Sequence, residues 1–432
     1  MDNPRELALK SLIKTDTLSV FSNLEINTTL QRANLSEADR GLYTALYLGV
    51  LEKKLTLDYI IKKYSSTPFE KIEVTEINLL RLGIYQLYFM DKIPDYSAVD
   101  ECVSLAPRKT KSFINAILRA FIRDGKKVDF PKGKWERVSI IQSYPMELIS
   151  LLIDSYGEDL TYELLNFQQD DHDLSLRVNT LKISVEMALK KIKELDKDAY
   201  LSAFAGDIIK ARLSINQIKD LIDKGLVFVQ DEASRICSMA VGAMPGERIL
   251  DACACPGGKS FSMSIDMENN GQLLSCDLHE NKLSLITKGA MRLGIDIITT
   301  KEQNGKVENK ELIDSFDRVL CDVPCSGLGV ILKKPDIKYK DIESINNLPN
   351  VQLDILSNCS KYVKKDGILI YSTCTINKRE NEDNINRFLK ENDSFVLDEF
   401  SVGSKVIKGM HTFFPHIEKT DGFFIAKMKR VK

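Results

Sequence analysis

Two cysteines with small polar neighbours are the residues of this sequence best suited to nucleophilic chemistry. Cys325 lies in Cys321-Asp-Val-Pro-Cys-Ser-Gly327, and Cys374 lies in Tyr371-Ser-Thr-Cys-Thr375. A cysteine taken at random is most often a small buried hydrophobic residue. These two follow apolar runs and are flanked by small polar residues, so we interpret them as thiols that act in covalent catalysis.

A third motif, Asp251-Ala-Cys-Ala-Cys-Pro-Gly-Gly-Lys-Ser260, has the composition of a ligand-binding turn between a strand and a helix. Adjacent glycines let the backbone pass close to a ligand, and the following helix offers free amides. The GxxxxGK[ST] spacing of a phosphate loop is absent. Asp277, about one strand–helix unit later, could accept both hydroxyls of a ribose. Together they predict an adenosine-containing cofactor, either a dinucleotide or S-adenosylmethionine.

These groups suit the methylation of cytosine at C5, a carbon that is a weak nucleophile. A thiolate that adds to C6 turns C5 into an enamine-like nucleophile, once the base is out of its stack. Asp322 could hydrogen-bond the base and steady the developing charge. The second thiol could help to remove the C5 proton or to release the adduct. Lys259 could lower a thiolate pKa or hold the nucleotide.

The cysteines and histidines do not have the spacing of metal ligands. The four histidines are scattered, no CxxC pair is present, and Cys253 and Cys255 lie inside the glycine turn. We therefore expect no metal.

The elements that must position these motifs are predicted by glycine-bounded apolar runs that alternate with helical stretches after Val227. Such alternation predicts a mostly parallel sheet, and ligands bind beyond the carboxyl ends of its strands. Cys325 and Cys374 follow the fourth and fifth strands. The predicted strands are Arg248–Asp251, Gln272–Ser275, Asp296–Thr299, Phe316–Cys321 and Gly367–Ser372.

Residues 1–130 read as helices, because apolar residues recur three and four positions apart. The densest apolar block, from Leu79 to Phe89, ends before Pro94. A helix is expected at 97–105, and the next one has a buried stripe: Phe113, Ile114, Ile117, Leu118 and Phe121. Asp124 to Trp135 reads as a linker. Residues 140–225 are expected to form a small α/β connecting domain with a strand at 175–179 and a helix at 183–195, and residues 226–432 the catalytic domain.

Composition indicates a soluble, multidomain protein without a membrane span or signal peptide: 432 residues, 44% apolar and 28% charged. Nine cysteines, an odd number, favour a reducing cytosol over a disulfide framework. Because the net charge is only −2, any binding of nucleic acid has to depend on local clusters of basic residues. One basic cluster is visible, which by itself reads as a solvated helix face: Arg108, Lys109, Lys111, Arg119, Arg123, Lys126 and Lys127.

The catalytic motifs resemble those of the RNA cytosine-5 methyltransferases. The matching segments are the CACPGGKS turn, DVPCSGLG with Lys333-Lys-Pro-Asp336, YSTCT with Glu380-Asn-Glu382, Gln230-Asp-Glu-Ala-Ser234 and Asp421-Gly-Phe-Phe424. Upstream, Leu80–Gln86, Val99–Glu101 and Phe113–Arg119 resemble the NusB-type helical RNA-binding fold. This fusion is similar to the bacterial 16S ribosomal RNA methyltransferase family called RsmB or Sun, over essentially the whole chain.

The resemblance implies a NusB-like helical domain, a small connecting RNA-binding subdomain and a Rossmann-like class I methyltransferase domain that uses S-adenosylmethionine. It makes Cys374 the nucleophile and Cys325 the thiol that assists adduct breakdown, with cytosine 967 of 16S RNA as the target. The residues implied at the cofactor and base sites are Cys253, Ala254, Cys255, Pro256, Gly257, Gly258, Lys259, Asp277, Asn304 and Asp322. Two of these depart from the family pattern, since Cys255 stands where alanine is usual and Asn304 where a carboxylate is expected.

The resemblance also makes the basic helix an RNA contact through Arg108, Lys109, Lys111, Arg119 and Arg123. The implied partner is 16S RNA, free or in an early small subunit, bound by a cytoplasmic monomer. Three alternatives remain at this point. The target could be transfer RNA or another ribosomal position, the protein could be a DNA-type methyltransferase in which Cys325 attacks, or it could be a non-catalytic RNA-binding regulator.

Overall fold

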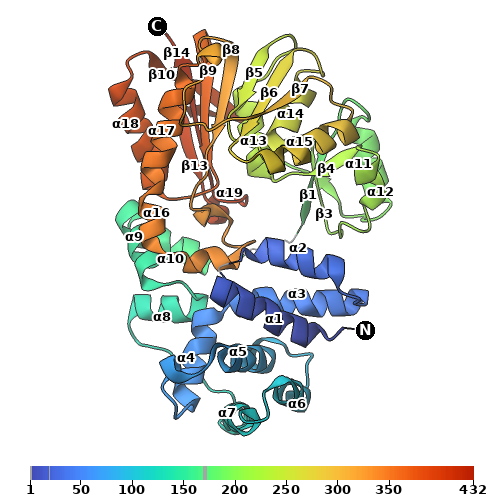
Figure 1. The fold of residues 1–432 in the computed structure, drawn as a ribbon, viewed down its shortest axis with the longest axis vertical. Helices are drawn as coiled ribbons and strands as arrows, with labels where there is room; N and C mark the ends of the chain where they lie inside the picture. The colour runs from blue at the N-terminus through green and yellow to red at the C-terminus, as the bar shows by residue number, and fades with distance from the viewer. Residues whose placement is uncertain (1, 19, 169–172) are drawn as a thin grey trace. The chain divides into compact units, whose positions relative to one another are not determined.

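A computed structural model describes residues 2–18, 20–168 and 173–432 of the chain (Figure 1). The chain divides into two units. Unit 1 comprises Met1–Asn166 with Ile331–Ile342, and unit 2 comprises Phe167–Val330 with Glu343–Lys432. The predicted boundary at about residue 140 therefore differs from the division in the structure. Two further helices, α9 and α10, belong with the N-terminal helices.

Unit 1 is helical throughout its described secondary structure. Its α-helices are α1 (Pro4–Leu18), α2 (Ser22–Arg32), α3 (Glu37–Glu52), α4 (Lys54–Tyr64), α5 (Val74–Phe89), α6 (Asp95–Leu105), α7 (Lys111–Arg123), α8 (Lys134–Gln142), α9 (Met146–Tyr156) and α10 (Glu158–Asn166). The break before Pro94 is confirmed, since α5 ends at Phe89 and α6 begins at Asp95. The linker ends two residues earlier than expected, because α8 begins at Lys134 and contains Trp135.

The Leu80–Gln86 motif contains an arginine, Arg81, that is buried in unit 1. Arg81 on α5 is 5% exposed, and its guanidinium pairs with Asp16 of α1 and Asp58 of α4 at 2.7 Å each. Because a buried charge is costly unless it is paired, these contacts fix α1 and α4 against α5. On α7 the predicted stripe is buried at Ile114, Ile117, Leu118 and Phe121, whereas Phe113 is half-buried.

The segment Ile331–Ile342, which follows the Cys325 motif in the chain, packs inside unit 1. Lys338 is 5% exposed, and its ammonium donates to the carbonyls of Glu52 and Gln142 at 3.3 and 3.0 Å. These are the last residues of α3 and α8, where free carbonyls and the helix dipole favour a cation. The same ammonium lies 4.2 Å from the centre of the Tyr144 ring.

Unit 2 begins with a four-stranded sheet in the order β2-β3-β1-β4. Its elements are β1 (Leu174–Val178), α11 (Val185–Lys193), β2 (Tyr200–Leu201), β3 (Ile208–Ala211), α12 (Lys219–Asp223) and β4 (Val227–Val229). Arg177 of β1, 1% exposed, pairs with Asp207 and with Asp266, which ends α14 (Gly258–Asp266). This buried ion pair attaches the small sheet to the catalytic sheet. The predicted connecting domain is thus divided: its first part, to Asn166, lies in unit 1, and the rest belongs to this sheet of unit 2.

The large sheet of unit 2 has the order β10-β14-β9-β8-β5-β6-β7, with β13 paired to β14 (Figure 1). β5 to β9 are parallel, and β14 runs antiparallel to β9. The strands are β5 (Arg248–Asp251), β6 (Gln272–Asp277), β7 (Ile298–Glu302), β8 (Phe316–Asp322), β9 (Val363–Thr373), β10 (Phe395–Leu397), β13 (Met410–Phe413) and β14 (Phe423–Arg430). This is the expected Rossmann-like fold.

Helices cover both faces of the large sheet. Alternate residues of each strand face opposite cores, as the period of two requires: Leu250 and Val319 pack on one side, Ile249 and Leu320 on the other. The first core includes α17 (Leu348–Ser360) and α18 (Glu382–Glu391), and the second includes α13 (Glu232–Val241) and α14. The remaining elements of unit 2 are α15 (Glu280–Leu293), α16 (Ile342–Asn346), β11 (Glu399–Val402), β12 (Lys405–Lys408) and α19 (Pro415–Glu418).

One predicted strand was misplaced along the chain. The strand expected at Asp296–Thr299 is β7, Ile298–Glu302. Asp296 lies in the turn after α15, where its backbone N–H donates to Asn269 at 2.9 Å, so the strand begins two residues later. The other four predicted strands lie within β5, β6, β8 and β9, three of which run further than expected.

Candidate active site

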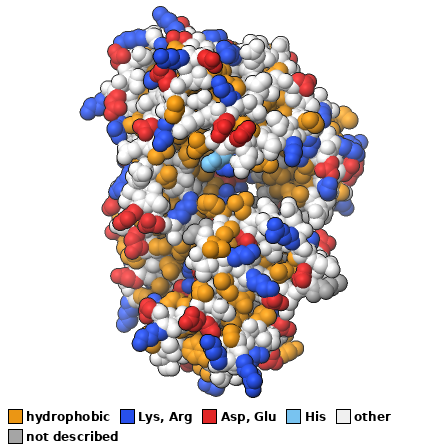
Figure 2. Space-filling view, in the orientation of Figure 1, with side chains coloured by type: hydrophobic (Ala, Val, Ile, Leu, Met, Phe, Trp, Pro, Cys, Tyr) orange, Lys and Arg blue, Asp and Glu red, His pale blue; other side chains and the backbone are white. Residues whose placement is uncertain are grey.

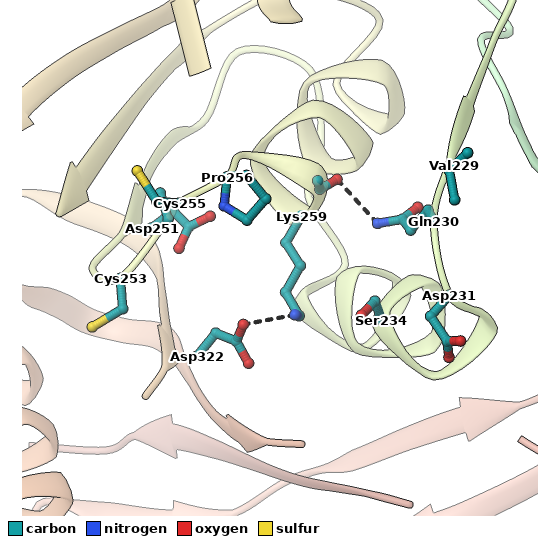
Figure 3. A pocket seen from close by; sticks show the side chains of 12 residues that line it. Val229, Gln230, Asp231, Ser234, Asp251, Cys253, Cys255, Pro256, Lys259 and Asp322 are labelled. Atoms are coloured by element: carbon teal, nitrogen blue, oxygen red, sulfur yellow. Dashed lines mark hydrogen bonds and ion pairs between the residues drawn. The ribbon is translucent and has the colours of Figure 1, made fainter. Parts of the chain in front are cut away.

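A pocket of about 190 Å³ opens at the carboxyl end of β5 (Figure 3). Most of the predicted glycine turn lines it, and Lys259 and Asp322 point toward one another within it (Figure 3). The lining residues are Val229, Gln230, Asp231, Ser234, Asp251, Cys253, Ala254, Cys255, Pro256, Gly258, Lys259 and Asp322. The predicted turn and the predicted carboxylate therefore meet in one cavity.

Gly257 gives the turn its shape although it does not line the pocket. Its φ of +110° is a conformation that residues with a Cβ rarely adopt, and a Cβ here would come within 2.6 Å of the Phe261 ring. Gly257 caps α14 without a side-chain hydrogen bond. The first amides of an α-helix have no partner within the helix, and because Gly258 and Lys259 line the pocket, the start of α14 could bind an anionic or polar ligand group there.

Lys259 and Asp322 form a buried ion pair at the centre of the site. The ammonium lies 2.6 Å from Asp322 Oδ2 and 5.3 Å from the centre of the Phe423 ring. Burial is the largest influence and lowers the pKa of Lys259, but the charge and hydrogen bond of Asp322, together with the neighbouring Cys237 and Asp251, outweigh it, and the net shift is upward. Ser372 donates to the other carboxylate oxygen of Asp322 at 2.8 Å. Lys259 therefore stays cationic, and Asp322 at the end of β8 is held by contacts from α14 and β9.

Asp277 and Asn304 occupy different places from the rest of the predicted cofactor residues. Asp277 ends β6 and accepts from the backbone N–H groups of Cys255 (3.4 Å) and His279 (3.0 Å). It thus borders the glycine turn without lining the cavity. Asn304 follows β7, and its side-chain oxygen accepts from the Lys306 backbone at 3.0 Å. The structure does not bring Asn304 to the pocket lining.

One wall of the pocket consists of residues just before and within α13, and the sequence analysis did not predict them as site residues. Gln230 donates to the Gly258 carbonyl at 3.0 Å and accepts from Ser262 at 2.6 Å, so it braces the start of α14 (Figure 3). Asp251 was also missed as a pocket residue. Burial raises its pKa to about 7. The signal was present for Gln230, since the Gln230–Ser234 segment carries the family resemblance.

Cys325 and Cys374 lie side by side, with their sulfur atoms 3.3 Å apart. The two loops are joined by further hydrogen bonds: the Gly329 backbone donates to the Cys374 carbonyl at 3.1 Å, and the hydroxyls of Ser326 and Thr375 lie 2.7 Å apart. The hydrogen bond with Cys374, together with burial, raises the pKa of Cys325 well above its usual range. Cys325 therefore keeps its proton and can donate it toward the Cys374 sulfur.

The two cysteines of the glycine turn also keep their protons. Burial raises the pKa of Cys253, and burial with the charge of Asp277 raises the pKa of Cys255 to about 12. Both remain thiols at neutral pH, and a thiol is neither a strong nucleophile nor a metal ligand. Within the described residues, no group of three or more histidine, cysteine, aspartate or glutamate side chains could hold a metal ion.

Comparison with known proteins agrees with this geometry in both units. The family described as 16S rRNA methyltransferase RsmB/F matches residues 238–429, and the NusB family matches residues 2–123. The chain is 34% identical to the probable ribosomal RNA small subunit methyltransferase B of Bacillus subtilis (strain 168), over 99% of this chain and 98% of that protein. This chain belongs to the ribosomal RNA small subunit methyltransferase B family.

Another member of the family extends the match to the full length of both chains. The probable ribosomal RNA small subunit methyltransferase B of Synechocystis sp. is 31% identical over 100% of each chain. Membership of the small subunit methyltransferase B family confirms the expected enzyme class and the NusB-type N-terminal fold.

Two solved structures share the fold of this methyltransferase. The crystal structure of PH0851 has a TM-score of 0.82 at 22% identity and covers 100% of this chain and 99% of that one. NSun6 from Pyrococcus horikoshii with SFG has a TM-score of 0.58 at 19% identity, over 68% of this chain and 100% of that one. Both likenesses concern the fold.

The basic cluster of this small subunit methyltransferase B family member is on the surface of unit 1. Arg108, Lys109, Arg119 and Arg123 are exposed, and Lys111 is half-buried. Arg119 is partly engaged by Asn115 at 2.8 Å and Asp100 at 3.9 Å. Figure 2 shows lysine and arginine side chains interspersed with acidic ones over the visible face, in keeping with the net charge of −2.

No helix in the described part of the chain is long and apolar enough to span a membrane.

Proposed function

We propose that this protein methylates C5 of a cytosine in small-subunit ribosomal RNA, by family resemblance cytosine 967 of the 16S RNA, through a covalent adduct with Cys374. The observation that carries the proposal is the pair of sulfur atoms 3.3 Å apart at the ends of β8 and β9. Ser372, two residues before Cys374, hydrogen-bonds Asp322 of the pocket, which links this pair to the cofactor site.

S-adenosylmethionine is the methyl donor, and it supplies an electrophilic methyl group. The pocket has the donors and acceptors that its charged amino-acid end and ribose require. The first amides of α14 suit a carboxylate, and the side-chain oxygens of Asp231 suit an ammonium or hydroxyls. Asp277, at the border of the turn, is the acceptor proposed for the ribose. The residues present therefore fit this cofactor.

The thiolate of Cys374 adds to C6 of the flipped base, which makes C5 nucleophilic. After methylation water takes the C5 proton, the electron pair of that C–H bond re-forms the C5–C6 double bond, and the C6–S bond breaks so that Cys374 departs as a thiolate. Cys325, whose thiol keeps its proton beside Cys374, assists this release. A carboxylate offers about four acceptor positions, of which Lys259 and Ser372 occupy two. Asp322 retains capacity to hydrogen-bond the base.

The substrate is proposed to be free 16S RNA or an early small-subunit assembly, bound by a monomer in the cytoplasm, where ribosomal subunits form. The NusB-type unit supports a ribosomal substrate over transfer RNA. Exposed basic residues near α7 are proposed to hold phosphates, which would position the RNA without specifying its sequence. Lys259 serves as the cation that positions Asp322.

The test compares wild type with Cys374→Ala and Cys325→Ala, using a tritiated methyl donor and small-subunit ribosomal RNA. We expect Cys374→Ala to transfer no methyl groups and Cys325→Ala to accumulate a covalent protein–RNA adduct on a denaturing gel. A Cys374→Ala enzyme that still methylates, together with a Cys325→Ala enzyme that forms no adduct, would reverse the two roles. Absence of labelling with wild type would refute the substrate assignment.

A further inference from the structure

Glu380 is a fully buried carboxylate between the two cysteine loops, and the proposed mechanism leaves it without a role. It is 0% exposed and follows Cys374 by six residues. Three groups donate to it: the Ser326 backbone N–H at 2.9 Å, the Gln352 side chain at 2.8 Å and the Asn377 side chain at 2.9 Å. These donors come from three separate segments of unit 2, so one carboxylate holds all three together.

The Cys325 loop is held on both sides of the cysteine. Glu380 accepts from the N–H of Ser326, the residue after Cys325. Gln352 of α17 donates to the carbonyl of Pro324, the residue before it, at 3.0 Å. Because the same Gln352 side chain also donates to Glu380, the two contacts form one continuous network around Cys325.

The turn after Cys374 is fixed to the same network. Asn377 donates to the second oxygen of Glu380, and its own backbone N–H donates to the Thr375 hydroxyl at 3.2 Å. Thr375 in turn contacts the Ser326 hydroxyl at 2.7 Å. Each cysteine therefore has a neighbour whose position depends on Glu380.

We propose that Glu380 is a positioning residue that holds the thiol of Cys325 against Cys374 for release of the methylated base. This inference rests on the covalent mechanism proposed above. Glu380 acts through the two loops and does not itself contact the substrate. Adduct breakdown needs both thiols, whereas adduct formation needs Cys374 alone. The proposed role therefore predicts that loss of the Glu380 carboxylate slows adduct breakdown more than adduct formation.

The chemistry of the three contacts explains why a carboxylate is needed. Both oxygens of Glu380 face donors, and an ionised carboxylate only accepts hydrogen bonds. In Glu380→Gln the new NH₂ group would face a donor, whichever way the amide is turned. A buried donor without an acceptor is costly, so the loop that carries it moves.

The experiment measures adduct formation and adduct breakdown separately in the full-length protein with S-adenosylmethionine and small-subunit ribosomal RNA. Glu380→Gln is compared with wild type, with Cys325→Ala and with Glu247→Gln. Glu247 pairs with Arg318 at 2.6 Å before β5, so it is a matched, partly buried glutamate outside the cysteine network. Gln352→Met is the second test variant, because it removes the donor to Pro324 and keeps the side-chain length.

We expect Glu380→Gln to form the adduct within about threefold of the wild-type rate and to resolve it about tenfold more slowly, as loss of a buried hydrogen bond implies. Gln352→Met should shift the same ratio in the same direction, and Glu247→Gln should leave it unchanged. Equal slowing of both steps, or an unchanged ratio in the folded variants, would overturn the proposal. Should Glu380→Gln not fold, Gln352→Met decides the question.

The outcomes separate this inference from the mechanism on which it rests. Wild type that methylates without any adduct, even in Cys325→Ala, refutes the covalent mechanism and with it the role of Glu380. Adduct in Cys325→Ala with normal breakdown in Glu380→Gln and Gln352→Met refutes only the positioning role.

Discussion

Asp251 illustrates how one residue at the end of a strand acquires an unusual titration. It is 1% exposed, and burial raises its pKa from 3.8 to about 7. Its carboxyl accepts from the Ser260 hydroxyl at 2.7 Å, and Ser260 contacts Ser275 at 2.9 Å. The folded protein therefore holds a proton here that the unfolded chain releases near pH 4.

We predict that Asp251 makes the stability of the protein fall as pH rises from about 4 to about 7. The folded pKa is higher than the unfolded one, so unfolding releases a proton in that range, and the loss reaches up to about 4 kcal/mol. Asp251→Asn should remove this dependence, and it should be more stable than wild type at pH 8 but not at pH 4. Denaturant unfolding of both proteins at several pH values measures this dependence of stability on pH. Parallel stability profiles for the two proteins would contradict the prediction.

The structure brings some of the predicted site residues together and leaves others apart, which the sequence could not foresee. Cys325 and Cys374 were paired on the expectation that they end neighbouring strands, and their sulfur atoms lie 3.3 Å apart. Asn304 also follows a strand, yet its side chain bonds to the Lys306 backbone in its own loop. Loop conformation after a strand depends on local hydrogen bonds that residue type alone does not reveal.

At the scale of elements, the backbones at Gly329, Cys374 and Gly422 lie so close together that no side chain fits between them. Gly329, after the Cys325 motif, donates to the Cys374 carbonyl and accepts from the Gly422 backbone at 2.9 Å. A Cβ on Gly329 would overlap the Gly422 carbonyl and lie 2.9 Å from the Cys374 carbonyl oxygen. This close approach gives a physical reason for the glycine in the Asp421–Phe424 segment.

We predict that Gly329→Ala destabilises the protein by about 3 kcal/mol and lowers methyl transfer, because the added methyl group pushes the Cys374 turn and the Gly422 segment apart. Gly41→Ala is the control, since nothing lies within 4 Å of a Cβ there and Gly41 sits inside α3. Alanine at position 41 should stabilise by about 0.5–1 kcal/mol. Thermal unfolding and methylation rates of both variants test this, and equal behaviour of the two would contradict it.

At the scale of the whole molecule, charge is balanced, so RNA binding has to depend on local surfaces. The net charge of −2 provides no general attraction to RNA. Arg119 and Arg123 on α7 are exposed while the opposite face of that helix is buried in the core of unit 1. The amphipathic character of α7 thus serves packing on one side and leaves cations free to meet solvent on the other.

We predict that Arg119→Ala with Arg123→Ala weakens binding of small-subunit RNA and reduces the slope of log affinity against log salt by about 1 to 2, as expected for one or two lost phosphate contacts. Binding of S-adenosylmethionine should not change. Lys361→Ala is the control, because Lys361 is exposed in unit 2 outside the predicted RNA-binding segments and already pairs with Glu308 at 2.7 Å. RNA titrations at several salt concentrations provide the measurement. A slope equal to that of wild type would exclude these residues from the interface.

The sequence by itself determined the class of fold and the order of the elements, and it placed Cys325 and Cys374 after neighbouring strands. Period-two and helical patterns are local, and the ends of parallel strands lie along one edge wherever the strands pair. Only the tertiary structure decided that Ile331–Ile342 belongs to unit 1, that Gln230 and Asp251 line the pocket, and that Glu380 joins both cysteine loops. These features depend on contacts between residues far apart in the chain, and the pattern along a single sequence carries no record of such distances.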